Sequence, residues 1–130
     1  ALEWQAQEFV ASAELALEWC MDVDDAPDPP EPLAMAVFRI FQEMLSNVGR
    51  HARAQHLRVA IQVTGGELSL LVQDDGVGAA AQAFEAADAY GVMGMRERAR
   101  HFGGRIDITS APGEGTRMCL TLALPQRERP

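Results

Sequence analysis

A helix-length stretch that ends at His51 constrains the fold most strongly, because it carries two different stripes of side chains. Apolar residues recur at helical spacing and predict a core-facing stripe: Leu33, Val37, Ile40, Phe41, Met44, Leu45 and Val48. The neighbouring stripe, within Phe41–His51, is polar: Glu43, Asn47, Arg50 and His51. Positions four, seven and eight apart stack over successive turns, so these four side chains are expected to line the floor of one cleft. A carboxylate, an amide and two cationic or near-cationic groups suit a metal-bound polyphosphate.

Size and charge narrow the classes of function. A chain of 130 residues fits one domain and buries roughly two thirds of its unfolded surface, so it needs no disulfide or metal to fold. The net charge of −8 argues against a nucleic-acid surface, but not against a single nucleotide. All eleven positive charges are arginines, which excludes a P-loop lysine and with it a Walker-type ATPase.

The ends and the cysteines lead to three further expectations. We expect one domain over residues 1–125 and a polar tail over 126–130, and a first residue Ala1 rather than Met indicates part of a longer protein. No membrane-length apolar run or signal peptide is visible, so we expect a cytoplasmic domain without direct membrane contact. Cys20 and Cys119 fall in predicted strands and are expected to be buried, reduced thiols without a function.

Periodicity in the rest of the chain predicts two more helices and five strands. The expected helices are Leu2 to about Ala13 and Met93–Phe102, the second stopped by Gly103-Gly104. Alternating apolar residues mark the strands Leu15–Met21, Leu57–Val63, Leu68–Val72, Ile106–Ile108 and Met118–Leu124, with hairpin turns at Gly65-Gly66 and Ala111–Gly115. The sequence therefore predicts an α+β fold, a two-layer α/β sandwich in which about three helices cover one face of a mixed sheet of about five strands.

The segment Asp74-Asp75-Gly76-Val77-Gly78 follows a predicted strand and has three interpretations. It fits an ordinary turn, in which glycine supplies a positive φ. It also fits a loose dinucleotide fingerprint, but two carboxylates would repel a pyrophosphate and no βαβ unit surrounds it. In the third interpretation the segment is a cleft wall, where an aspartate accepts a hydrogen bond from an adenine amino group and the glycines admit the base. Only the third accounts for both the aspartate and the glycines.

A second glycine-bearing segment, Gly91-Val92-Met93-Gly94-Met95, precedes a predicted helix. Its backbone N–H groups would then lie at the positive end of the helix dipole, where phosphate binds. An ordinary glycine-rich start of a helix explains the same pattern. A third segment, Gly113-x-Gly115-Thr116, follows later in the chain.

The order of these segments resembles the ATP-binding domain of the GHKL superfamily, which includes sensor histidine kinases, gyrase-type topoisomerases, Hsp90 chaperones and MutL proteins. Two runs, Phe41–Ala52 (FQEMLSNVGRHA) and Gly94–Ala99 (GMRERA), are similar to one subfamily of bacterial sensor histidine kinases that signals to response regulators with a LuxR-type output domain. The resemblance extends from about Leu2 to Pro125. It implies the Bergerat fold and two cofactors, ATP and Mg²⁺.

The resemblance also implies roles for the residues of the polar helix. Asn47 matches an asparagine that is a Mg²⁺ ligand in this family. Glu43 matches a glutamate that acts as a general base or orients the attacking nucleophile. Arg50 matches a cation that contacts phosphate oxygens. His51 either does the same or packs against the family's lid, the segment that corresponds to Ala79–Tyr90 in this chain.

The other segments acquire roles in the same way. Asp74 matches the aspartate that binds the adenine amino group, and Gly76 and Gly78 match its accompanying glycines. The remaining implied nucleotide-binding residues are Gly91, Gly94 and Met95 at the second glycine segment, which borders the lid, and Thr116.

The implied chemistry is transfer of the ATP γ-phosphoryl group to a histidine on a separate helical dimerisation domain. None of His51, His56 and His101 occupies an acceptor motif, so this chain is expected to bind Mg-ATP without phosphorylating itself. The implied partners are that domain, within a homodimeric parent, and a response regulator of the LuxR-type class. Two alternatives remain open: an anti-sigma-type serine kinase of the same superfamily, and a non-catalytic nucleotide-binding or interaction module.

Overall fold

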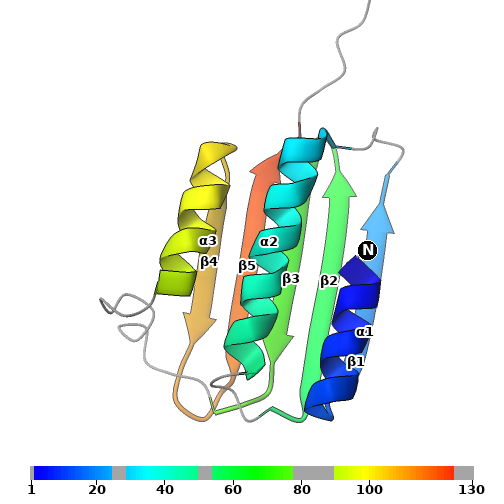
Figure 1. The fold of residues 1–130 in the computed structure, drawn as a ribbon, viewed down its shortest axis with the longest axis vertical. Helices are drawn as coiled ribbons and strands as arrows, with labels where there is room; N and C mark the ends of the chain where they lie inside the picture. Colours follow the sequence, from blue (N-terminus) through cyan, green and yellow to red (C-terminus); the bar gives the residue numbers. More distant parts are fainter. Residues whose placement is uncertain (1, 25–28, 50–53, 78–89, 125–130) are drawn as a thin grey trace, which may run out of the picture.

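The chain folds into a mixed sheet with helices on one side (Figure 1). The structure is a computed structural model that describes residues 2–24, 29–49, 54–77 and 90–124. Its elements, in chain order, are α1 (Leu2–Ala13), β1 (Ala16–Val23), α2 (Glu31–Asn47), β2 (His56–Thr64), β3 (Glu67–Asp74), α3 (Tyr90–His101), β4 (Arg105–Ser110) and β5 (Thr116–Ala123).

Within the described residues, five strands form one sheet in the order β1-β2-β3-β5-β4. β1 runs parallel to β2, and the other neighbouring pairs are antiparallel. Both predicted hairpins are present, with Gly65 and Gly66 at positive φ in the first turn. The prediction of a mixed, roughly five-stranded sheet is confirmed.

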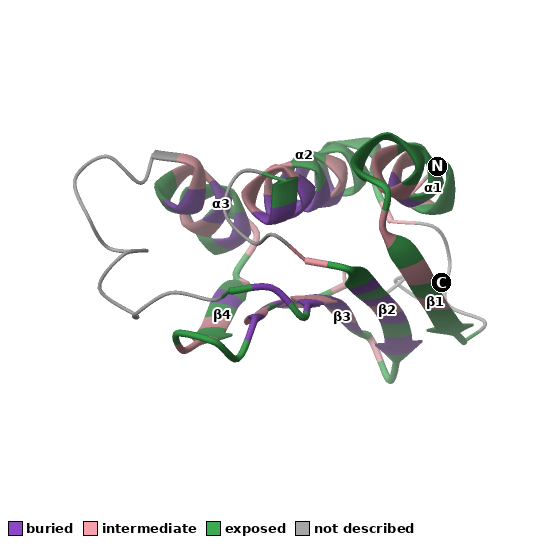
Figure 2. Ribbon diagram, turned by 90° about the horizontal axis from the view of Figure 1, so that it is seen from below, coloured by how far each residue is buried: buried purple, intermediate pink, exposed green. Residues whose placement is uncertain are grey.

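The helices form the second layer (Figure 2). α1 lies beside β1, α2 crosses the middle of the sheet and α3 lies over β4 (Figure 1). The buried sides of both layers face each other, while the opposite face of the sheet has no helix over it within the part that the structure describes. The expected two-layer α/β sandwich is therefore confirmed.

The core forms because the strands alternate and α2 carries a continuous apolar stripe. Every predicted apolar position of α2 is buried: Leu33, Val37, Ile40, Phe41, Met44, Leu45 and Val48. Beneath them, Leu70 is paired with Ile61 on β2 and Leu120 on β5, and both Leu70 and Leu120 have no exposed surface. Burying each such side chain contributes about 1.5–3 kcal/mol, which holds the two layers together.

Two helices, α2 and α3, begin or end at different residues from those predicted. The regular part of α2 ends at Asn47 rather than His51, and a wider π-type turn follows over Val48 and Gly49. Phe9 of α1 packs against Gly49, where a Cβ atom would lie 3.3 Å from its ring. Glycine is a weak helix former, so this contact can override the helical pattern.

α3 begins at Tyr90, three residues before the predicted start at Met93. Val92, Met95 and Ala99 are all buried and share one face at helical spacing. Packing of this face against the core overrides the low helix propensity of Gly91 and Gly94. The prediction that residues 91–95 precede a helix is therefore wrong, because these residues form its first turns.

The burial expected for the cysteines is also wrong for Cys20, which is exposed, while Cys119 is half-buried. Cys20 lies between Trp19 and Met21, so it points away from the helices to the uncovered face of the sheet. Met21 lies on the helix side but is 62% exposed, because the edge strand β1 extends beyond the cover of α1. An edge strand therefore does not bury its alternating apolar residues along its whole length.

Candidate nucleotide site

Three elements that carry the predicted site meet at one end of the sandwich. The C-terminal end of α2 and the end of β3 lie near the lower edge of the molecule in Figure 1, and α3 starts from its lower end, beside α2. The side chains involved lie on the facing sides of the two layers, or at their margin. This end of the fold is therefore the candidate nucleotide site.

The end of α2 presents an amide whose orientation is fixed. The Asn47 side-chain nitrogen donates a hydrogen bond of 3.0 Å to the backbone carbonyl of Glu43, one turn earlier. With the NH₂ group used as the donor, the Oδ1 atom is the acceptor of this amide. A half-buried amide oxygen is a hard donor of the kind that Mg²⁺ accepts.

Glu43 lies directly against the start of α3. A Cβ atom built on Gly91 would lie 2.6 Å from the Glu43 Cδ atom and closer still to its Oε1 atom. Only a residue without a side chain leaves the Glu43 carboxylate in this position. The structure thus explains the glycine in the first turn of α3 by its contact with a site carboxylate.

The end of β3 presents a buried carboxylate. Asp74 is 5% exposed, and its Oδ1 atom accepts a hydrogen bond of 2.8 Å from the Gly76 N–H group. The Thr116 N–H group also donates to this carboxylate. Burial raises the pKa of Asp74 above its ordinary value of 3.8 and outweighs these two hydrogen bonds, while the neighbouring charge of Asp75 raises it further.

The second hairpin supports the Asp74–Val77 segment from one side. Gly115 has a φ of +75°, and a Cβ atom there would lie 3.1 Å from the Asp74 carbonyl carbon and closer to its oxygen. The Gly113 N–H group donates a hydrogen bond of 2.6 Å to the Val77 carbonyl. The glycines of this turn therefore allow its backbone to lie directly on the Asp74–Val77 segment, an explanation that the spacing alone did not provide.

Thr116 takes part in this support. Its hydroxyl group lies 2.8 Å from the Ser110 hydroxyl group, and the Ser110 hydroxyl donates a hydrogen bond of 3.0 Å to the Gly115 carbonyl. Thr116 is also paired with Asp74 across β3 and β5. Its backbone thus contacts Asp74 directly, which places it at the predicted nucleotide site.

Asp75 also lies in this region, and no contact was predicted for it from the sequence. Its Oδ1 atom accepts hydrogen bonds from the N–H groups of Gln55 (2.8 Å) and His56 (2.9 Å). Its Oδ2 atom lies 2.6 Å from the His56 Nδ1 atom. The hydrogen bond from the His56 backbone, followed by that from its ring, lowers the pKa of Asp75 from 3.8 to about 2. No spacing signal identifies such a contact, because it joins residues 19 and 20 positions apart.

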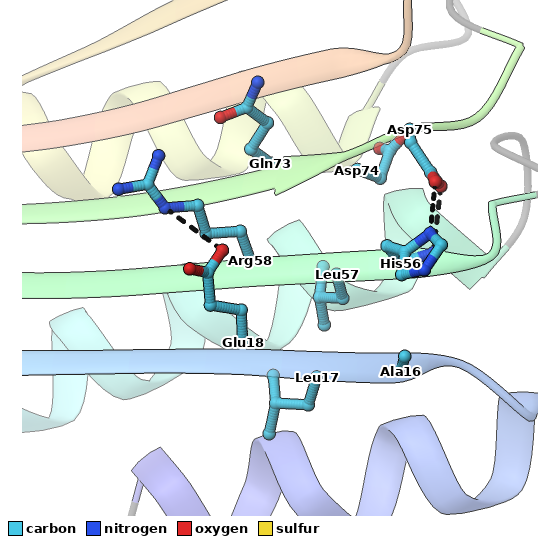
Figure 3. Close-up of a pocket in the computed structure, with 9 residues that line it drawn as sticks. All are labelled: Ala16, Leu17, Glu18, His56, Leu57, Arg58, Gln73, Asp74 and Asp75. Carbon is cyan, nitrogen blue, oxygen red and sulfur yellow. Dashed lines mark hydrogen bonds and ion pairs between the residues drawn. The ribbon is translucent and has the colours of Figure 1, made fainter.

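A pocket of about 430 Å³ opens beside Asp75 at the ends of β1, β2 and β3 (Figure 3). Although Asp74 borders it as well, most of its polar lining comes from outer-face side chains, among them Glu18, His56 and Arg58. These side chains point away from the helices, whereas the candidate nucleotide site lies between the helices and the sheet. We therefore do not assign the nucleotide to this pocket.

The remaining predicted residues are placed as follows. Arg50, His51 and Gly78 lie outside the described residues. Gly94 lies in α3 near Arg98, whose Nη1 atom would be 3.0 Å from an added Cβ atom. Met95 has no exposed surface and belongs to the core, so its side chain has a packing role. Backbone N–H groups in the first turn of a helix lack partners within that helix, which leaves Gly91 as a candidate phosphate contact.

Comparisons with known proteins agree with this geometry. Residues 33–126 match the family of histidine kinase-, DNA gyrase B-, and HSP90-like ATPases. Over 122 residues the chain is 34% identical to the sensor histidine kinase LiaS of Bacillus subtilis, covering 94% of this chain and 33% of LiaS. Over 90 residues it is 37% identical to an uncharacterized sensor-like histidine kinase of Chloroflexus aurantiacus, covering 65% of this chain and 15% of that protein.

A solved structure supports the fold. The histidine kinase domain from the Erythrobacter litoralis EL346 blue-light activated histidine kinase has a TM-score of 0.77 at 21% sequence identity, covering 95% of this chain and 59% of that chain. The chain belongs to the histidine kinase-, DNA gyrase B- and HSP90-like ATPase family, and it is homologous to the ATP-binding domain of sensor histidine kinases. It spans a third or less of the length of the two curated relatives named above, 33% and 15%.

Among the residues described, no helix is both long and apolar enough to cross a membrane.

Proposed function

We propose that this chain is the Mg-ATP-binding catalytic domain of a sensor histidine kinase. The observation that carries the proposal is the buried carboxylate of Asp74, held by two backbone N–H groups at the end of the fold where α2 presents Asn47. A buried acceptor of this kind suits the amino group of adenine. We propose domain boundaries of 1–125, with 126–130 as a polar tail.

We propose that three described residues, Asp74, Gly76 and Asn47, bind ATP and Mg²⁺ together with Gly78 and Arg50, which lie outside the described residues. Asp74 accepts a hydrogen bond from the adenine amino group, while Gly76 and Gly78 allow the base to approach. The Oδ1 atom of Asn47 would hold Mg²⁺, which would neutralise charge on the phosphate oxygens. Arg50 and the Gly91 N–H group are the proposed phosphate contacts on the protein side.

The proposed reaction transfers the γ-phosphoryl group to a histidine of another domain. Phosphoryl transfer depends mainly on positioning and on charge stabilisation, so this chain supplies a rigid binding surface and a few polar groups. Glu43, held against Gly91, orients the attacking imidazole or accepts its proton. His51 is proposed as a phosphate or lid contact, with Gly94 and Thr116 supporting the site.

The whole protein is proposed to be a homodimer, with this domain in the cytoplasm. Its acceptor histidine lies on a helical dimerisation domain, and its phosphoryl group passes to a response regulator with a LuxR-type output domain. The curated relatives named above are sensor histidine kinases, which favours this proposal over a serine kinase or a non-catalytic module.

Replacing Asp74 with asparagine tests the adenine contact. An amide has a single acceptor oxygen, and the Gly76 and Thr116 N–H groups already compete for it. We expect Asp74→Asn to weaken binding of a non-hydrolysable ATP analogue about 10- to 100-fold, the range for a lost hydrogen bond to a charged group. Calorimetry with ATP and GTP analogues measures this change.

Stability separates this effect from unfolding. Because burial raises the pKa of Asp74, the folded state disfavours its charged form, so losing the charge offsets the loss of one acceptor oxygen and the variant should remain folded in thermal melting. Asp107→Asn on the exposed outer face is the matched control and should bind as wild type does. Undiminished binding by a folded Asp74→Asn variant would contradict the proposed adenine contact.

A further inference from the structure

The Asp74–Val77 segment is held from two opposite directions. The second hairpin holds one side, through the Gly113 hydrogen bond to Val77 and the backbone contact of Gly115. The other side is held by Asp75, whose carboxylate reaches the start of β2 (Figure 3). The Asp74–Val77 segment is thus held at both of its margins by contacts with neighbouring strands and turns.

The contacts of Asp75 join separate parts of the chain. Its Oδ1 atom receives two N–H groups, from Gln55 and His56, and its Oδ2 atom meets the His56 ring. The Gln55 carbonyl in turn accepts a hydrogen bond of 2.9 Å from the Ala16 N–H group. A single carboxylate therefore connects the segment after Asp74 to the first residues of β1 and β2.

The charge of this carboxylate is strongly favoured by its partners. Three hydrogen bonds from His56 and Gln55 lower its pKa to about 2, so it is ionised throughout the ordinary pH range. Hydrogen bonds to a charged acceptor are stronger than neutral ones. The side chain points to the outer face of the sheet, away from the helices, so it does not itself reach the candidate nucleotide site.

We propose that Asp75 is a positioning residue of the nucleotide site, which fixes the Asp74–Val77 segment to the start of β2 and so holds the Asp74 carboxylate ready for adenine. This inference rests on the proposed function. It assigns Asp75 an action through Asp74, with no contact of its own to the nucleotide.

The chain offers variants that separate the parts of this contact. Asp75→Ala removes all three hydrogen bonds. Asp75→Asn keeps one acceptor oxygen for the two backbone N–H groups, while its NH₂ group can donate to the neutral ring of His56. His56→Ala removes the ring but keeps the backbone N–H group of residue 56. Asp107→Ala removes an exposed carboxylate paired with Arg105 elsewhere on the outer face, and so controls for charge.

Binding of ATP and GTP analogues is the first measurement. We expect Asp75→Ala to raise the Kd for the ATP analogue about tenfold, corresponding to the loss of about one charge-assisted hydrogen bond, and to reduce the preference for ATP over GTP. Asp75→Asn and His56→Ala should stay within about threefold of wild type, and Asp107→Ala should be unchanged. A fitted stoichiometry near that of wild type shows that the variant is folded.

Hydrogen exchange of the Gly76 amide is the second measurement. This N–H group donates to the Asp74 carboxylate rather than to that of Asp75, so its exchange reports whether the segment keeps its position. We expect faster exchange at Gly76 in Asp75→Ala and wild-type exchange in Asp75→Asn. Unchanged exchange at Gly76, or an unchanged Kd and ATP preference in Asp75→Ala, would overturn the inference while leaving the proposed function intact.

The two proposals fail in different ways. If wild type binds no ATP analogue, the proposed function is wrong and the role of Asp75 at a nucleotide site is lost with it. If wild type binds ATP and Asp75→Ala binds it equally well, only the inference about Asp75 is wrong. Should Asp75→Asn lose as much affinity as Asp75→Ala, the carboxylate would be acting through its charge rather than through the hydrogen bonds to β2, which also contradicts the inference.

Discussion

Replacing Gly115 with alanine is expected to lower the free energy of unfolding by about 2–5 kcal/mol, the sum of a left-handed backbone penalty and an overpacking cost. The residue has a φ of +75°, and its added Cβ atom would lie 3.2 Å from the Asp75 Cα atom and closer to the Asp74 carbonyl oxygen. The obstructing atoms belong to the backbone of β3, which cannot rotate aside. Denaturant unfolding measures the loss, and nucleotide affinity should fall with it because Asp74 is displaced.

Gly113 provides the matched control in the same turn. It also has a positive φ, +80°, but a Cβ atom there meets nothing within 4 Å. Gly113→Ala should therefore cost only the left-handed backbone penalty, about 1–2 kcal/mol. Equal losses in the two variants would show that the backbone contact between Gly115 and β3 contributes nothing.

Gly91→Ala is expected to leave the domain folded and to reduce phosphoryl transfer by about 10²- to 10⁴-fold, the usual contribution of a positioned general base. Alanine is a better helix former than glycine by about 0.5–1 kcal/mol, so α3 itself tolerates the change. The added methyl group would overlap the Glu43 carboxylate, which must then swing away from its position. The measurement is the rate of phosphoryl transfer to the proposed histidine-bearing dimerisation domain, added in trans.

A double-mutant cycle isolates this contact. In a Glu43→Ala background there is no carboxylate to displace, so Gly91→Ala should cause no further loss of rate. Gly94→Ala, in the same helix, meets only the flexible end of the Arg98 side chain and should leave the Glu43 carboxylate in place. An additive loss in the cycle would mean that Gly91 acts on phosphoryl transfer independently of Glu43.

The layers of the fold could be predicted because the core pattern is long and regular. The apolar stripe of α2 and the alternation of β2, β3 and β5 predict the same sandwich, and packing confirms it. The ends of helices depend on tertiary contacts that the pattern does not contain. Phe9 lies against Gly49 at the end of α2, and the buried face of α3 extends that helix back to Tyr90.

The candidate site could be predicted where it follows motif order. Asp74 and Asn47 lie at the same end of the sandwich, as the order of the glycine segments indicated. The reasons for the glycines were not available from the sequence, because they depend on what each missing side chain would touch. Gly91 faces Glu43, and Gly115 faces the backbone of Asp74, contacts between elements far apart in the chain.

Asp75 shows the same limit more clearly. A carboxylate beside a motif aspartate looks solvated in the sequence, and its partners, Gln55 and His56, lie near the start of a different strand. Only the antiparallel pairing of β2 with β3 brings them together. The register of β2 and β3 therefore positions the Asp74–Val77 segment as much as the motif residues themselves do.

A calorimetric titration with a non-hydrolysable ATP analogue, with and without Mg²⁺, tests the central claim most directly. The comparison is between wild type, Asn47→Ala and the control Ser46→Ala, which changes the neighbouring residue of α2. The account predicts magnesium-dependent binding in wild type and Ser46→Ala, and loss of that dependence in Asn47→Ala. Absence of binding by folded wild type, or equal magnesium dependence in Asn47→Ala, would contradict the assignment of this end of the sandwich as a Mg-ATP site.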